Sequence, residues 1–188
     1  MDKFNFHVTQ ASIEDQNDPN RPDGYLQIGD YEDKNKDGGF YLLIGYFKEK
    51  KSLHLFQFYN NTNIKGLGHK VLCKVLNILK EWYDIDEKSM ISLEASGGGQ
   101  CQNPINIKEA KEYLQKNFPE VIKLLIEDDL YDDDDDYVIQ QVCNIIANQK
   151  LIKYYESLGF QVIDNDGYSA EMISNIKTVL DKCNVKFK

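Results

Sequence analysis

The sequence predicts a mixed α/β fold of the α+β kind, in which helices flank a mostly antiparallel central sheet. Residues 25–30 and 40–48 are typical of a hairpin, and residues 52–59 continue it as a third strand because apolar side chains alternate along them. Apolar residues at helical spacing over 69–82 then indicate an amphipathic helix. Strands that follow one another through short turns favour antiparallel pairing.

The other elements follow from local signals. Asn106 with Glu109 matches a capping box, Pro119 is a suitable first residue for a helix, and Asn165-Asp166-Gly167 is a hairpin turn signal. We expect strands at residues 5–9 and 90–95, from Gly159-Phe160 onward and at 168–173, and helices at 106–117, from 119 onward, at 148–158 and at 176–183. Residues 97–146 then form a helical and acidic insertion before the last main helix.

Length and composition predict one domain over residues 1–188, since 41% hydrophobic residues suffice for a single core. Four cysteines without C-x-x-C spacing predict reduced thiols, with neither a disulfide framework nor a metal site. No apolar run approaches the ~18 residues of a membrane span, and the first residues lack a signal-peptide pattern. A soluble cytoplasmic protein is therefore expected.

The charge pattern limits the partners. A formal net charge of −9 argues against direct binding to nucleic acid or to anionic membranes, which use surfaces rich in Lys and Arg. The same charge is compatible with cationic acceptors such as polyamines or basic peptides. Runs of aspartate such as Asp132–Asp136 most often form a solvated, mobile loop. The alternatives are attraction of an amine substrate and a metal site.

The segment Asn63-Ile64-Lys65-Gly66-Leu67-Gly68 lies between the third predicted strand and the amphipathic helix. Glycines at the head of a helix let the backbone approach a bulky anion, which the free N–H groups and the positive dipole end then bind. An ordinary glycine-containing turn is the alternative. Neither the third glycine of a dinucleotide fingerprint nor the Gly-Lys-Ser/Thr of a P-loop is present.

A second segment, residues 148–160, carries Asn148, Tyr155, Gly159 and Phe160 at fixed spacings. These spacings resemble the closing motif of the GNAT superfamily (Gcn5-related N-acetyltransferases), N-x-x-A-x-x-x-Y-x-x-x-G-F, with Leu151 where the family often has Ala.

The first segment is similar to the acetyl-CoA loop of the same family, Q/R-x-x-G-x-G/A, through Gly66 and Gly68, although Asn63 and Ile64 depart from it. The resemblance covers about residues 40–96 and 144–175, and residues 10–24 are too short for the family's first two helices.

The resemblance implies an acetyl-CoA-dependent N-acetyltransferase that moves an acetyl group to a primary amine by direct attack in a ternary complex. Acetyl-CoA is then a co-substrate and no metal is needed. The residues expected to bind it are Phe58, Tyr59, Asn60, Asn63, Ile64, Lys65, Gly66, Leu67, Gly68, His69 and Asn148.

Three side chains are candidates for the chemistry. Tyr155 matches the family's general acid, because a phenol with a pKa of about 10 is protonated at neutral pH and can donate to the departing thiolate. His54, with an ordinary pKa of about 6.5, is the candidate base, and Glu94 is the second. The alternatives are a core aromatic for Tyr155, a structural sheet residue for His54 and an ordinary polar helix residue for Asn148.

The insertion at 97–146 is expected to act as a lid or acceptor platform. A different class of function remains open: a catalytically inactive GNAT-like binding or regulatory module that uses this insertion as its partner interface. The acceptor amine is a small molecule, a peptide or a protein, and the resemblance allows a homodimer.

Overall fold

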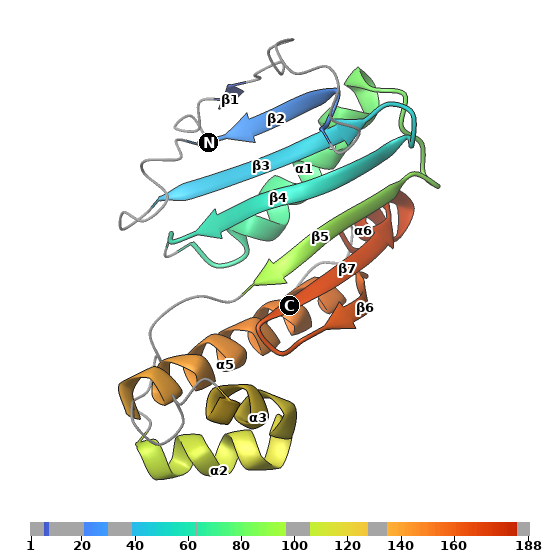
Figure 1. Ribbon diagram of the computed structural model, residues 1–188. Coiled ribbons are helices and arrows are strands. Elements are labelled where there is room, and N and C mark those ends of the chain that lie inside the picture. Colours follow the sequence, from blue (N-terminus) through green and yellow to red (C-terminus); the bar gives the residue numbers. More distant parts are fainter. Residues whose placement is uncertain are drawn as a thin grey trace. The chain divides into compact units, whose positions relative to one another are not determined.

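The computed structural model describes residues 6–7, 21–29, 39–62, 64–96, 106–127 and 135–183. Within them, seven strands form a sheet in the order β1-β2-β3-β4-β5-β7-β6 (Figure 1). The first three pairings are antiparallel and the β4–β5 pairing is parallel. The predicted fold class, a mostly antiparallel sheet flanked by helices, is therefore confirmed.

The strands are β1 (Phe6–His7), β2 (Gly24–Ile28), β3 (Phe40–Phe47), β4 (Ser52–Asn60), β5 (Met90–Ser96), β6 (Gln161–Asn165) and β7 (Ser169–Asn175). The helices are α1 (Leu67–Trp82), α2 (Ile107–Asn117), α3 (Pro119–Glu127), α5 (Asp135–Ser157) and α6 (Ile176–Cys183). Apart from α5, each of these was expected from the sequence to within a few residues. Helix α5 begins at Asp135, well before residue 148, so its first turns lie inside the insertion expected at 97–146. Of the strand expected at 5–9, only 6–7 lies within the described residues.

The chain divides into two compact units. The first comprises Met1–Leu93, Leu158–Phe160 and Ile173–Lys188, and the second comprises Glu94–Ser157 and Gln161–Met172. The insertion expected at 97–146 belongs to the second unit. The prediction of one domain over the whole chain stays a prediction.

The β2–β3–β4 meander provides the sheet of the first unit. In the antiparallel register Leu26 is opposite Ile44, and Leu42 is opposite Phe58. Leu26, Leu42 and Ile44 are buried, as expected for alternate residues on the core face of a strand. The predicted hairpin and third strand are confirmed.

Helix α1 follows β4 and is amphipathic, as predicted. Its buried residues include Leu72, Val75 and Leu76, all on one stripe of the helix. The helix ends where the backbone N–H of Tyr83 donates to the Leu79 carbonyl at 2.9 Å.

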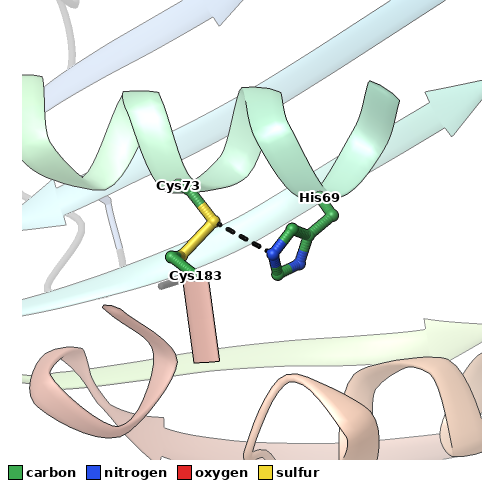
Figure 2. Close-up of side chains that lie close together, drawn as sticks. All are labelled: His69, Cys73 and Cys183. Carbon is green, nitrogen blue, oxygen red and sulfur yellow. Dashed lines mark hydrogen bonds between the residues drawn. A yellow bond between two sulfur atoms is a disulfide. The ribbon is translucent and has the colours of Figure 1, made fainter. Parts of the chain in front are cut away.

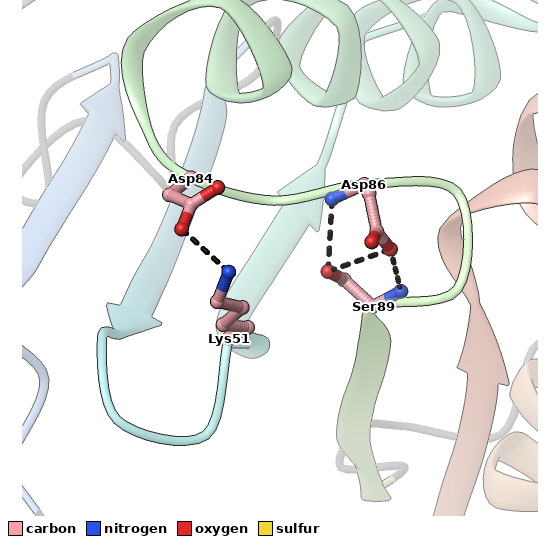
Figure 3. Close-up of polar contacts among 4 residues, drawn as sticks. All are labelled: Lys51, Asp84, Asp86 and Ser89. Atoms are coloured by element: carbon pink, nitrogen blue, oxygen red, sulfur yellow. Dashed lines mark hydrogen bonds and ion pairs between the residues drawn. The ribbon is translucent and has the colours of Figure 1, made fainter.

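The loop from α1 to β5 is held by its own polar groups (Figure 3). The Asp86 carboxylate accepts from the backbone N–H of Lys88 at 2.7 Å and of Ser89 at 2.9 Å. These bonds, the Lys88 bond above all, lower the pKa of Asp86. Beside this loop Lys51 and Asp84 form a 2.6 Å ion pair, whose side chains are more than half exposed and which therefore adds little stability.

Helix α6 is attached to the same loop. The backbone N–H of Ile176 donates to the Ser89 carbonyl at 3.0 Å, and that of Lys177 donates to the Glu87 carbonyl at 3.0 Å. Asn175 caps the helix, because its side chain accepts from the backbone N–H of Thr178 at 2.8 Å. These hydrogen bonds hold α6 against the rest of the first unit independently of any disulfide.

The second unit has a helical core of its own. The capping box predicted at α2 is present, with Asn106 and Glu109 each accepting from the other's backbone. A buried cluster joins α2, α3 and α5; its members are Ala110, Leu114, Val121, Leu125, Val138, Val142 and Ile145. The predicted insertion helices are confirmed, while residues 97–105 lie outside the described part.

The acidic run differs in part from the expected loop. Asp135 and Asp136 lie in the first turn of α5, where the positive end of the helix dipole stabilises carboxylates. Lys111 of α2 also pairs with Asp135 at 3.8 Å. Residues 132–134 lie outside the described part.

The structure bears on two predictions about compartment. The prediction of four reduced thiols is wrong: Cys73 and Cys183 form a disulfide, and Cys143 is also disulfide-bonded. Spacing along the chain could not show this, because the pair is 110 residues apart. Cys101 lies outside the described residues. Among the described helices, none is both long and apolar enough to cross a bilayer.

Candidate functional site

The head of α1 has the features expected of an anion site. Gly66 caps the helix with a φ of 75°, in the left-handed region that favours glycine. No side chain of the described residues caps the helix, and its first turn carries no acidic residue. No atom of the described residues lies within 4 Å of the position that a side-chain Cβ at Gly66 would occupy, and Ile64 and Lys65 beside it are exposed. The positive end of the α1 dipole is therefore accessible to a bulky anion.

The segment between β4 and α1 is ordered by short polar contacts. The Asn60 side-chain oxygen accepts from the Thr62 hydroxyl at 2.6 Å, and the Leu67 N–H donates to the Ile64 carbonyl at 3.2 Å. These contacts place the exposed residues immediately before the helix. Asn63, predicted to bind the cofactor, lies outside the described residues.

Strand β4 changes its pairing in the middle. Its parallel ladder with β5 consists of Leu53↔Ile91, His54↔Ser92 and Leu55↔Leu93, whereas β4 continues to Asn60.

A β-bulge lies at the same place. Leu43 of β3 pairs with Gln57, and Ile44 pairs with Leu55, so Phe56 is the additional residue. A bulge bends its strand and commonly marks the end of a pairing. The ladder to β5 thus ends where the bulge begins, and residues 56–60 continue along β3.

His54 and Ser92 meet across the β4–β5 ladder. His54 Nδ1 and Ser92 Oγ are 2.9 Å apart, and the His54 ring lies edge-on to Phe56 with centroids 4.5 Å apart. With Nδ1–H donating to the Ser92 hydroxyl, Nε2 keeps its lone pair and can accept a proton. Ser92 is thus a hydrogen-bond partner of the predicted base His54. This serine was not identified from the sequence.

An open hollow of about 370 Å³ lies over these side chains. Its lining includes His54, Phe56 and Ser92 together with Phe47 and Lys50. The Lys50 ammonium lies 5.6 Å from the centroid of the Phe47 ring. The hollow therefore combines an imidazole, aromatic surface and one cation at its edge.

The His69 side chain is not positioned to bind an anion. The residue is 9% exposed, and its Nε2 lies 3.6 Å from the Cys73 sulfur. Burial lowers the pKa of His69, so the ring is neutral at pH 7. Any contribution of His69 to phosphate binding comes from its backbone N–H in the first turn of α1.

Three predicted site residues belong to the second unit. Glu94 is exposed on β5, whereas Asn148 and Tyr155 lie seven positions apart on the buried face of α5. Tyr155 is 5% exposed, and its ring lies edge-on to that of Tyr154, with centroids 5.2 Å apart. Burial raises the pKa of Tyr155 well above 10, which keeps the phenol protonated.

Asn148 is fully buried and takes part in the fold. Its Nδ2 donates to the Gly167 carbonyl in the β6–β7 turn at 3.2 Å, so the amide joins α5 to that turn. Its Oδ1 has no hydrogen-bond partner among the described residues. One acceptor of the amide is therefore left for a ligand or water, while the donor is used structurally.

The structure thus brings His54 close to Ser92, and places the exposed loop and the head of α1 directly after β4. Comparison with protein-family models, with curated proteins and with solved structures found no match. Membership of the GNAT superfamily therefore stays a prediction from the two motifs.

Proposed function

We propose that the protein is a GNAT-like N-acetyltransferase that transfers the acetyl group of acetyl-CoA to a primary amine. The observation that carries the proposal is the succession within one unit of the bulge at Phe56, the end of the β4–β5 ladder and a helix headed by Gly66. A strand edge beside a helix N-terminus suits a ligand with an extended amide arm and a diphosphate.

The head of α1 fits the diphosphate. Among the described residues Gly66 leaves open space for it, and the first-turn amides of Gly68 and His69 face no acidic side chain from that turn. Lys65 is exposed directly before the helix and adds a positive charge. Backbone donors of this kind do not require a particular side chain at Asn63 or Ile64.

The far half of β4 fits the amide arm. An extended ligand can add to a strand edge through backbone hydrogen bonds, as peptides do in β-augmentation. The candidate segment is residues 56–60, which follows the last β5 pair and leads directly into the Gly66 loop. A backbone N–H in this segment would then polarise the thioester carbonyl, an oxyanion-hole role.

His54 would supply the base. Acetyl-CoA supplies a thioester, whose carbonyl carbon forms a bond with the amine nitrogen while the carbon–sulfur bond breaks. His54 Nε2, directly or through one water, accepts the proton that the amine loses. Ser92 holds the ring through Nδ1 and thereby fixes its orientation. Glu94 remains the second candidate for this role.

The motif resemblance alone implies roles for two further residues, Tyr155 and Asn148. Tyr155 would protonate the departing CoA sulfur, and its raised pKa keeps the proton available over the physiological range. The Asn148 Oδ1 would accept a hydrogen bond from the pantetheine arm. Both roles compete with the core packing and the Gly167 hydrogen bond described above.

The test is turnover, measured as thiol release from acetyl-CoA with a panel of polyamines, amino sugars and lysine peptides. His54→Gln should lower kcat by about 10²–10⁴-fold with little change in the KM for acetyl-CoA. Glu49→Gln, in the exposed β3–β4 turn, is the matched control. Unchanged kcat in the His54 variant would remove this residue from the mechanism.

We place this activity in the cytoplasm, as the sequence predicted. Thiol reductants there keep most cysteines reduced, so the Cys73–Cys183 bond would open in that compartment. The net charge of −9 favours a cationic acceptor, although Lys50 at the edge of the hollow favours one that presents a neutral amine locally.

One observation favours the inactive binding module as a second candidate. Helix α3 exposes Leu124 by 57% and Ile126 by 54%, which suits a surface covered by a partner. In that case acetyl-CoA would not stabilise the chain. Sedimentation of the chain with and without Leu124→Lys would show whether the partner is a second copy.

A further inference from the structure

Three potential metal ligands meet where α1 and α6 lie side by side (Figure 2). His69 and Cys73 are four residues apart on α1, a spacing that places both on one helical face, and Cys183 is the last residue of α6. The His69 nitrogen and the two sulfurs all lie within 4.8 Å of one another. All three residues belong to the first unit.

The disulfide prevents metal binding in the oxidised chain, because zinc binds thiolates. Reduction changes the chemistry of the site. A dithiol such as dithiothreitol gives two electrons and two protons to the Cys73–Cys183 bond and is itself oxidised to a cyclic disulfide. The two cysteines become thiols, and binding of a divalent metal would release their protons.

The distances suit a tetrahedral zinc ion. With Zn–N near 2.0 Å and Zn–S near 2.3 Å, tetrahedral angles put a nitrogen and a sulfur ligand about 3.5 Å apart. His69 Nε2 and Cys73 Sγ are already 3.6 Å apart. The Cα atoms of Cys73 and Cys183 are 5.8 Å apart, so both side chains can reach one common point.

We propose that the reduced chain binds Zn²⁺ through His69, Cys73 and Cys183. The metal then takes over the connection between α1 and α6 that the disulfide makes in the oxidised chain. Both cysteines are partly exposed, so metal and reductant have access and a water can occupy the fourth position. This site is independent of the acetyltransferase proposal, to which His69 contributes only a backbone N–H.

The first experiment titrates Co²⁺, as a spectroscopic substitute for Zn²⁺, into the full chain with and without prior reduction. The reduced chain should bind one equivalent, with the intense visible bands of tetrahedral cobalt and a thiolate-to-cobalt charge-transfer band. Zn²⁺ should displace the cobalt and remove these bands. The oxidised chain should give neither signal.

Variants assign the ligands. His69→Ala should weaken binding at least 10-fold, and Cys73→Ser/Cys183→Ser should abolish it. Reduction also frees Cys143, so Cys101→Ser/Cys143→Ser is the matched control and should bind as the wild type does. His54→Gln controls for the loss of a histidine elsewhere. Binding that survives in Cys73→Ser/Cys183→Ser, or that is lost in Cys101→Ser/Cys143→Ser, would overturn the assignment.

A stability readout keeps the test decisive where reduction weakens the fold. Thermal unfolding of the reduced wild type should shift upward by several degrees with Zn²⁺, because metal binding only to the folded state stabilises it. The reduced His69→Ala chain should show no shift. If Zn²⁺ leaves the reduced wild type unchanged, the proposal is wrong whether or not that chain is folded.

Discussion

Removing the Cys73–Cys183 disulfide should cost the oxidised chain much of its stability. The bond joins residues 110 positions apart, so it closes a long loop in the unfolded chain. The chain-entropy relation for a loop of this length gives about 16 cal/mol/K, or about 5 kcal/mol at 25 °C. A typical domain is stable by only about 5–15 kcal/mol. Cys73→Ala/Cys183→Ala should therefore unfold at a far lower denaturant concentration than the wild type.

Guanidinium unfolding without reductant measures this loss. The double variant avoids a single free thiol that could attack another disulfide. Cys73→Ser/Cys183→Ser is the matched control: if the cross-link is the cause, both double variants lose the same free energy within about 1 kcal/mol. The unfolding slope should also rise, since the unfolded chain is less compact without the bond. A loss below about 1 kcal/mol in both variants would refute the reasoning.

Three further predictions follow from individual side chains. Tyr155→Phe retains the buried ring, so steady-state kinetics should show kcat lowered about 100-fold with acetyl-CoA binding retained; an unchanged rate would exclude the phenol as the acid. Asn148→Leu should cost about 1–3 kcal/mol in denaturant unfolding, because the Gly167 carbonyl loses its donor, and Asn148→Asp should cost more by burying a charge; equal costs would contradict a buried site. The pKa of Asp86 is lower in the folded than in the unfolded chain, so its stabilisation is present above about pH 4 and is lost as pH falls through the folded pKa. Melting temperatures of Asp86→Asn should accordingly depend less on pH in acid than those of the wild type, and parallel curves would contradict this.

Most of the fold was predictable because its signals are local. Residues close together in sequence carry each of these signals. They are the alternation in β3 and β4, the apolar stripe of α1, and the capping box of Asn106 and Glu109. The acidic run was predicted less well. A block of like charges favours a loop, but Asp135 and Asp136 are also favourable in the first turn of a helix.

The candidate site was predictable only where it is contiguous. The loop ending at Gly68 is one segment, and its position at the head of α1 follows from the sequence. The His54–Ser92 contact depends on the register of two strands that are joined through α1. The Cys73–Cys183 bond depends on two helices meeting, and sequence spacing carries no signal for it. The four-residue spacing of His69 and Cys73 was the one available sign of that cluster.

Thermal unfolding with acetyl-CoA tests the central claim most directly, because it requires no knowledge of the acceptor. At about 100 times its dissociation constant, the ligand should add roughly 2.7 kcal/mol, or about 5–10 °C for a chain of this size. The Gly66→Asp variant should show no rise in melting temperature with acetyl-CoA, because its carboxylate would occupy the open space proposed for the phosphate and repel it. Gly66→Asn, which carries the same backbone conformation without the charge, should keep most of the rise. No shift in the wild type at millimolar acetyl-CoA, or an equal shift in Gly66→Asp, would contradict the account.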